Sequence, residues 1–237
     1  SHPTAYRDDF GFEAGPRGTP AVSGGIVYVH GADGTAAAVD AATGKALWKV
    51  DTRQRFGWQK AFFGQACSPL VAHEAVYLNV GGKPSAGIVA LKAKTGETLW
   101  TATSDEAGYS SPVAATLKGA AYIVSFTREG LKGLDPKTGA VRFEYRWRSR
   151  SNASVNAASP LVTGDSIFVT ASYSTGAILL DWDGKQLTKI WSGDDQLSAH
   201  YATPVEKDGV LYGYHGRQEY GQELRAVDLR TGKVRWS

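Results

Sequence analysis

Two histidines near the end of the chain are the residues best suited to chemistry. His200 stands three residues before Thr203, and His215 begins a polar stretch that ends at Gly221. Histidine titrates near neutral pH, so it can act as a general acid or base or help to bind an anion. The residues expected to act with them are Asn156, Arg217 and Glu219. The catalytic candidates are therefore His200, His215, Asn156 and Glu219, and the alternative is that both histidines are structural.

Metal binding and nucleophilic catalysis find less support in the residue types. The histidines lack the His-x-His and His-Glu-x-x-His spacings of common zinc sites, and His73-Glu74 falls in a different loop. We therefore expect no metal site. The one cysteine, Cys67, directly precedes the pair Ser68-Pro69, where a small core side chain is expected rather than a nucleophile.

Three arginines alternate with other residues in the segment from Tyr145 to Arg150. If this segment is extended, Arg146, Arg148 and Arg150 share one face, where they form either an anion-binding stripe or an ordinary solvated strand face. The formal net charge of the whole chain is only +3. We therefore expect no nucleic-acid partner.

Two markers recur along the chain and indicate how these residues are positioned. A Ser/Thr-Pro pair opens a short apolar run five times, at intervals of 43 to 49 residues. These openers are Thr19-Pro20, Ser68-Pro69, Ser111-Pro112, Ser159-Pro160 and Thr203-Pro204. Each segment then closes with a Thr-Gly or Asp-Gly turn followed by Trp or Phe. Such a period is the signature of a repeat architecture.

The second repeat shows the plan of each unit. Short β-branched and aromatic runs, among them Val76–Val80 and Gly87–Leu91, are separated by glycine turns, so the repeat predicts four strands in an antiparallel meander. In three repeats an aspartate precedes the turn threonine by three residues, where it can accept turn hydrogen bonds: Asp40, Asp135 and Asp228. We expect Asp181 to take this role in the fourth repeat.

Composition agrees with an all-β chain and excludes several other classes. The chain has 237 residues, of which 42% are apolar and 21% charged, and no helical period of useful length. No segment approaches the ~18 consecutive apolar residues of a membrane helix. The first residues, Ser-His-Pro-Thr, lack the apolar core of a signal peptide. We expect a segment of a longer precursor, or a chain whose leader was removed.

The repeat resembles the PQQ-like β-propeller repeat. Its clearest copies are Gly25–Gly34 running into Ala38–Trp48, and Gly209–Tyr212 running into Ala226–Trp236. Quinoprotein dehydrogenases and the lipoprotein of the bacterial outer-membrane β-barrel assembly machinery contain such repeats. The resemblance implies a periplasmic or extracellular location and an all-β propeller of four-stranded antiparallel blades.

Five blades are expected in this chain, at about residues 16–52, 66–105, 109–150, 156–195 and 201–237. Residues 1–15 are a candidate outer strand of an incomplete or closing blade. The resemblance implies rings of seven or eight blades, so that five blades form either a small ring or an arc of a larger one. An open arc would expose blade faces and favour self-association.

The resemblance argues against a quinone cofactor. It implies that quinoprotein dehydrogenases carry two adjacent cysteines joined in a small disulfide ring, and this chain has a single cysteine. We therefore expect no PQQ and no other cofactor.

The residues just before each opener differ in type from repeat to repeat. A purely structural position would tend to repeat, so this variation favours a shared pocket on the loop face, with ordinary loop variability as the alternative. The expected ligand-binding residues are Arg17, Gln65, Tyr109, Asn156, His200, Tyr201 and Arg217. Two functions remain open: a rigid scaffold that binds a protein or small ligand through this face, or a hydrolase of esters or phosphoesters, promiscuous or metal-assisted.

Overall fold

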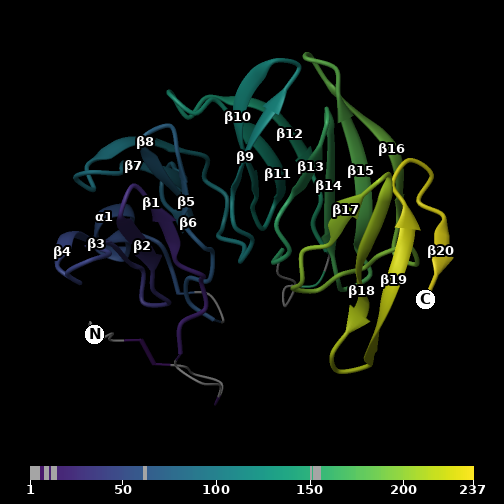
Figure 1. Cartoon of the computed structure of the whole chain (residues 1–237), viewed down its shortest axis with the longest axis horizontal. Coiled ribbons are helices and arrows are strands. Elements are labelled where there is room, and N and C mark those ends of the chain that lie inside the picture. Colours follow the sequence, from purple (N-terminus) through teal and green to yellow (C-terminus); the bar gives the residue numbers. More distant parts are fainter. Residues whose placement is uncertain (1–5, 8–10, 12–14, 61–62, 150, 152–155) are drawn as a thin grey trace. The chain divides into compact units, whose positions relative to one another are not determined.

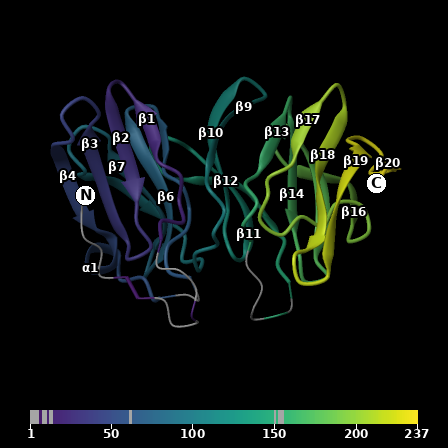
Figure 2. The same ribbon diagram turned by 60° about the horizontal axis from the view of Figure 1, so that its bottom comes forward.

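The computed structural model describes residues 6, 7, 11, 15–60, 63–149, 151 and 156–237. Within these residues the chain forms twenty strands and one short helix, arranged as five four-stranded antiparallel sheets (Figures 1 and 2). The predicted all-β class and the five blades are confirmed. The strand expected within residues 1–15 lies mostly outside the described residues.

The chain divides into two compact units, and the first is formed by residues 1–112 together with 136–140. Its first blade consists of β1 (Ala21–Ser23), β2 (Ile26–His30), β3 (Thr35–Asp40) and β4 (Ala46–Asp51). Helix α1 (Thr52–Phe56) follows. The second blade consists of β5 (Leu70–Ala72), β6 (Ala75–Gly82), β7 (Ala86–Lys92) and β8 (Thr98–Ala102).

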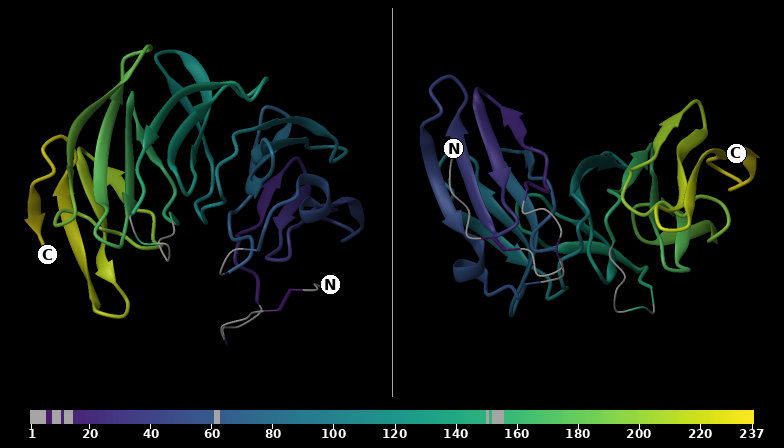
Figure 3. Two further views of the ribbon diagram at one scale, coloured as in Figure 1. Left: turned by 180° about the vertical axis from the view of Figure 1, so that it is seen from behind. Right: turned by 90° about the horizontal axis from the view of Figure 1, so that it is seen from below.

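The second unit, residues 113–135 and 141–237, holds the remaining three blades, which Figure 3 shows in two further views. The third blade consists of β9 (Val113–Leu117), β10 (Ala120–Phe126), β11 (Gly130–Leu134) and β12 (Val141–Arg146). The fourth blade consists of β13 (Leu161–Thr163), β14 (Ser166–Ala171), β15 (Gly176–Trp182) and β16 (Leu187–Gly193). The fifth consists of β17 (Val205–Lys207), β18 (Val210–Arg217), β19 (Gly221–Asp228) and β20 (Val234–Trp236).

The turn between the third and fourth strands is held by its aspartate, as the sequence predicts. Asp40 accepts hydrogen bonds from the backbone N–H and the hydroxyl of Thr43, at 2.7 and 2.6 Å. In the fourth blade the prediction of Asp181 is wrong. Asp183 accepts from the turn amides there, while Asp181 pairs with Arg230 of the next blade.

The Ser/Thr hydroxyls of three openers, Ser68, Ser111 and Thr203, link neighbouring blades. The hydroxyl oxygen of Ser68 accepts from the backbone N–H of Thr19 at 2.9 Å, and that of Ser111 accepts from Ser68 N–H at 2.8 Å. The same bond runs from the N–H of Ser159 to the hydroxyl of Thr203, also at 2.8 Å. A side-chain acceptor therefore satisfies a backbone donor at the start of the first strand, where the sheet supplies no partner.

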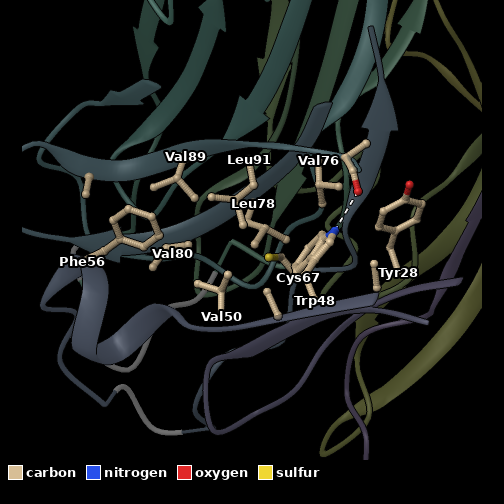
Figure 4. Packing of buried hydrophobic residues seen from close by; sticks show 14 of the residues in the cluster. Tyr28, Trp48, Val50, Phe56, Cys67, Val76, Leu78, Val80, Val89 and Leu91 are labelled. Atoms are coloured by element: carbon tan, nitrogen blue, oxygen red, sulfur yellow. Dashed lines mark hydrogen bonds between the residues drawn. The ribbon is translucent and has the colours of Figure 1, made fainter. Parts of the chain in front are cut away.

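The aromatic residue of the fourth strand makes a second link, shown for Trp48 in Figure 4. Three tryptophans lie over the turn glycine of the next blade and donate their indole N–H to the carbonyl oxygen three residues before it. These bridging tryptophans, with their acceptors, are Trp48 to Ala93 at 2.7 Å, Trp100 to Pro136 at 2.9 Å and Trp191 to Leu229 at 2.7 Å. Buried apolar residues of the second blade, among them Val76, Leu78 and Leu91, belong to the same core cluster as Trp48.

Candidate functional site

The hairpin β18–β19 extends beyond the other two strands of its blade. Its strands have eight residues each, whereas β17 and β20 have three, and the pairing continues to Arg217 opposite Gly221. The end of this hairpin carries His215, Arg217 and the turn residues up to Tyr220. His215 thus stands on a strand rather than in a loop.

The segment before the fifth opener lies along this hairpin and brings His200 to it. Ala199 forms an isolated bridge with Gly216, whose N–H donates to Ser198 O at 3.1 Å. On its other side the segment is fixed to β14, because Thr170 Oγ1 accepts from Ala199 N–H at 2.9 Å. Backbone pairing therefore places His200 beside the hairpin end.

His200 is enclosed by aromatic rings and by one amide. The imidazole stacks on Tyr201, with ring centroids 3.7 Å apart, and meets Tyr173 edge-on at 5.4 Å. Its Nδ1 donates to Gln218 Oε1 at 3.1 Å, while Nε2 has no hydrogen-bond partner among the described residues. Only 1% of the residue is exposed, and this burial lowers the pKa of His200.

Arg217 lies between two tyrosines at the hairpin end. Its guanidinium carbon is 4.0 Å from the centroid of the Tyr173 ring and 5.6 Å from that of Tyr220. Glu219 accepts a charge-assisted hydrogen bond from Arg217 at 2.7 Å. We call the residues Tyr173, His200, Tyr201, Arg217 and Tyr220 the hairpin cluster. It joins three predicted site residues to two tyrosines that the prediction did not include.

A hollow of about 300 Å³ borders this cluster, lined in part by Tyr173, His215 and Arg217. Two acidic residues, Asp194 and Asp195, form another part of its wall. The Nδ1 of His215 accepts a hydrogen bond from the backbone N–H of Ser198 at 3.1 Å. Burial and the nearby charge of Arg225 lower the pKa of His215, so both histidines are held neutral near neutral pH.

The hydrogen bonds do not assemble an acid/base pair. A general base is normally oriented by a carboxylate or a similar acceptor. In the part of the chain that the structure describes, neither His200 nor His215 hydrogen-bonds to a carboxylate, and Glu219 pairs with Arg217 instead. The free ring nitrogen of His200 is buried. What the arrangement offers is an aromatic and guanidinium surface rather than a catalytic dyad.

Asn156 hydrogen-bonds to the third blade and to the segment that follows it. Its amide Nδ2 donates to Thr127 O at 2.8 Å and to Trp147 O at 3.1 Å, and the residue is buried. Among described residues its Oδ1 accepts no hydrogen bond. Asn156 therefore fixes a loop to the third blade.

The other three predicted ligand-binding residues belong to the first unit and contact residues there. Gln65 is buried and donates from Nε2 to Val80 O at 2.8 Å. The hydroxyl of Tyr109 accepts from Phe63 N–H at 3.0 Å, and the Arg17 guanidinium lies 5.4 Å from the Phe63 ring.

Among the described residues, the possible metal ligands are dispersed and the cysteine is buried. The described residues contain no cluster of three or more His, Cys, Asp or Glu side chains that could hold a metal ion. Cys67 is fully buried with its Sγ 3.3 Å from His30 Nδ1, and burial raises the pKa of its thiol to about 12.

No motif in the sequence marks Tyr173 or Tyr220 as a site residue. Tyr173 and the following Ser174 have φ of 61° and 57°, so the β14–β15 turn adopts a left-handed conformation that non-glycine residues rarely take. Neither tyrosine nor serine is a residue type that predicts such a turn. Tyr220 lies within the polar stretch from His215 to Gly221, but nothing in its spacing distinguishes it from its neighbours.

Comparison with known proteins gives a consistent match. A family model described as "Outer membrane protein assembly factor BamB" matches residues 7–237. The outer membrane protein assembly factor BamB of Yersinia pestis is 26% identical over 227 residues, which cover 92% of this chain and 55% of that protein. The dehydrogenase subunit of a quinone alcohol dehydrogenase from Gluconacetobacter polyoxogenes is 29% identical over 190 residues, covering 72% and 24%.

The fold also matches a solved structure. The crystal structure of BamB from Moraxella catarrhalis superposes with a TM-score of 0.68 and 19% identity, covering 93% of this chain and 60% of that one. This likeness shows the β-propeller fold. The chain spans about half the length or less of the curated relatives described above. Among the described residues, no helix is long and apolar enough to cross a membrane.

Proposed function

We propose that this chain, which belongs to the family of the outer membrane protein assembly factor BamB, is a protein-binding scaffold in outer-membrane protein assembly. Its binding surface would be the hairpin cluster at the end of β18–β19. The partner would be another component of the assembly apparatus, and the location would be periplasmic. This scaffold would bind its partner without PQQ.

The Arg217 stack is the observation that carries this proposal. Its guanidinium lies between Tyr173 and Tyr220, and Tyr220 is 85% exposed. Tyrosine and arginine dominate the binding energy of protein interfaces, because each presents a large apolar surface together with a polar group. The stack and the ion pair with Glu219 hold the guanidinium in place before a partner arrives, which reduces the entropy lost on binding.

The surroundings of this surface suit a protein partner better than a small substrate. The adjoining hollow is open, and its wall combines the acidic pair Asp194 and Asp195 with the cation of Arg217. Exposed Tyr201 extends the same surface. Mixed charge around aromatic anchors is typical of the polar rim and central anchors of an interface.

Binding of the immobilised chain to a purified outer-membrane assembly complex, taken from a strain without its own factor of this family, tests the proposal. We expect Arg217→Ala and Tyr220→Ala each to weaken binding about tenfold or more, which corresponds to ~1.4 kcal/mol. The matched control is Leu99→Ser, since Leu99 is half exposed on β8. Binding that is absent in the wild type, or equally tight in all variants, would contradict the proposal.

The hydrolase alternative is tested on the same proteins. A panel of ester and phosphoester substrates should show no turnover that depends on His200. Turnover that is abolished by His200→Ala but kept by Tyr220→Ala would contradict the scaffold proposal and support a hydrolase.

A further inference from the structure

Charged side chains bridge neighbouring blades at their turns in the second unit. Between the third and fourth blades, the ammonium of Lys118 in the β9–β10 turn lies 2.9 Å from Asp165 Oδ2. Between the fourth and fifth blades, Arg230 in the β19–β20 turn donates to both carboxylate oxygens of Asp181, at 2.8 and 2.9 Å. In each case a cation from a turn of one blade reaches a carboxylate of its neighbour.

The first and second blades lack the first of these two bridges. Gly24 stands in the β1–β2 turn at the position that Lys118 has in the third blade, and glycine has no side chain to reach across. Glu74 stands in the β5–β6 turn at the position of Asp165 in the fourth blade. The carboxylate of Glu74 forms no hydrogen bond or ion pair with the described residues. A carboxylate is therefore present where its cation is missing.

The second bridge is absent for a different reason. Lys94 of the second blade corresponds to Arg230, and Asp40 of the first blade corresponds to Asp181. Asp40, however, accepts hydrogen bonds from Thr43 of its own turn at 2.7 and 2.6 Å. Among the described residues, the ammonium of Lys94 has no hydrogen-bond or ion-pair partner. A cation is thus left unpaired beside the unpaired carboxylate of the same two blades.

An open groove of about 580 Å³ lies between these two blades, and both charged residues line it. Its walls are two four-stranded blades of the first unit that share one core cluster. Ile26, Tyr28 and Val71 also line the groove and belong to that cluster or pack against it, as Figure 4 shows for Tyr28. The groove therefore combines an apolar floor with one free charge of each sign, Glu74 and Lys94.

The charge pattern of the groove selects the chemistry of its ligand. Lys92 also lines the groove, but its ammonium lies 3.8 Å from Glu97, so Glu74 and Lys94 are the charges left for a ligand. A lysine side chain can cover apolar surface with its stem while its ammonium reaches a carboxylate. Because the groove is open, a small molecule would stay largely in water, whereas a peptide can continue beyond both ends of the groove.

We propose that the groove between the first and second blades binds an extended peptide segment of a partner protein. A basic side chain of the segment pairs with Glu74, an acidic side chain pairs with Lys94, and an apolar side chain between them covers the floor around Tyr28. The groove belongs wholly to the first unit and shares no residue with the hairpin cluster. This binding site is therefore independent of the proposed function.

NMR titration of the full chain with capped tetrapeptides tests the charge pattern. The mixed-charge probes are Lys-Leu-Leu-Glu and Glu-Leu-Leu-Lys, which cover both chain directions, and the controls are Lys-Leu-Leu-Lys and Glu-Leu-Leu-Glu. We expect at least one mixed-charge peptide to shift the amide signals of Gly24 and Lys94 and to bind roughly threefold or more tightly than either control. No binding of any peptide, or equal binding of all four, would overturn the inference.

Three variants locate the binding in this groove. Gly24→Lys supplies the missing cation, which the backbone tolerates because Gly24 has φ of 57° and Lys118 has φ of 48°. It should weaken binding of the mixed-charge peptide about fivefold or more, because the new side chain fills the groove and pairs with Glu74.

The matched control is Gly164→Lys, at the same turn position of the fourth blade, where φ is 56° and an added Cβ meets no atom within 4 Å. This control should bind like the wild type, whereas Glu74→Lys should shift the preference to Glu-Leu-Leu-Glu. Equal weakening by the two glycine variants, or an unchanged preference in Glu74→Lys, would overturn the inference.

Discussion

At the scale of single residues, the cysteine and three of the histidines are enclosed, and burial favours their neutral forms. His30 and Cys67 contact each other in the core of the first unit. Burial lowers the pKa of His30 and raises the pKa of Cys67, so the neutral form of each is favoured. His200 and His215 follow the same rule in the second unit. Protonation of these buried histidines should therefore lower the free energy of unfolding as the pH falls.

His30 should make the chain less stable in mild acid. Burial lowers its folded pKa from 6.5 to about 4, so its contribution is complete above pH 6.5 and is lost as the pH falls toward 4. The loss from this residue is at most about 3 kcal/mol. Urea unfolding of the wild type and of His30→Gln, at pH 7.5 and pH 4.5, measures the difference.

We expect the wild type to lose more unfolding free energy than the variant over this range. His200 and His215 remain in both proteins, so their contributions cancel in the comparison. Equal losses of unfolding free energy in the two proteins would show that folding does not lower the pKa of His30, contrary to its burial.

At the scale of elements, two kinds of hydrogen bond hold a blade to its neighbour: the one to the opener hydroxyl and the one from the bridging tryptophan. Their motifs can be seen in the sequence, but their partners cannot. The Ser/Thr-Pro and Thr-Gly-x-x-Trp motifs predict strands and turns. Their partners lie 36 to 49 residues away, as in the bonds of Trp100 to Pro136 and of Thr19 to Ser68. A local pattern cannot reveal such partners, although the recurrence of the motifs indicated that they are structural.

Two turn glycines with the same backbone should respond differently to alanine. Gly96→Ala places a Cβ 2.8 Å from the Trp48 ring, whereas Gly44→Ala meets no atom within 4 Å. Both variants incur the cost of a left-handed alanine, roughly 1–2 kcal/mol. Gly96→Ala should cost about 1–3 kcal/mol more, because the ring must move.

Urea unfolding of both glycine variants measures this difference. Equal destabilisation would mean that Trp48 does not pack on the turn of the second blade.

At the scale of the whole molecule, the repeat predicted the architecture, and the candidate site was predicted only in part. His200, Tyr201 and Arg217 come together because Ala199 pairs with Gly216, a contact between segments with no shared motif. Tyr173 joins them through an unusual turn. Arg17, Gln65 and Tyr109 occupy corresponding positions in other repeats and contact residues of the first unit.

The most direct test of the scaffold account is photo-crosslinking from the hairpin end. A photoreactive phenylalanine analogue replaces Tyr220, which is 85% exposed, or Leu99 as the control, and the chain is mixed with the purified assembly complex. The account predicts one dominant crosslinked component from position 220, weakened by Arg217→Ala, and little product from position 99. Equal products from both positions, or a product unaffected by Arg217→Ala, would contradict it.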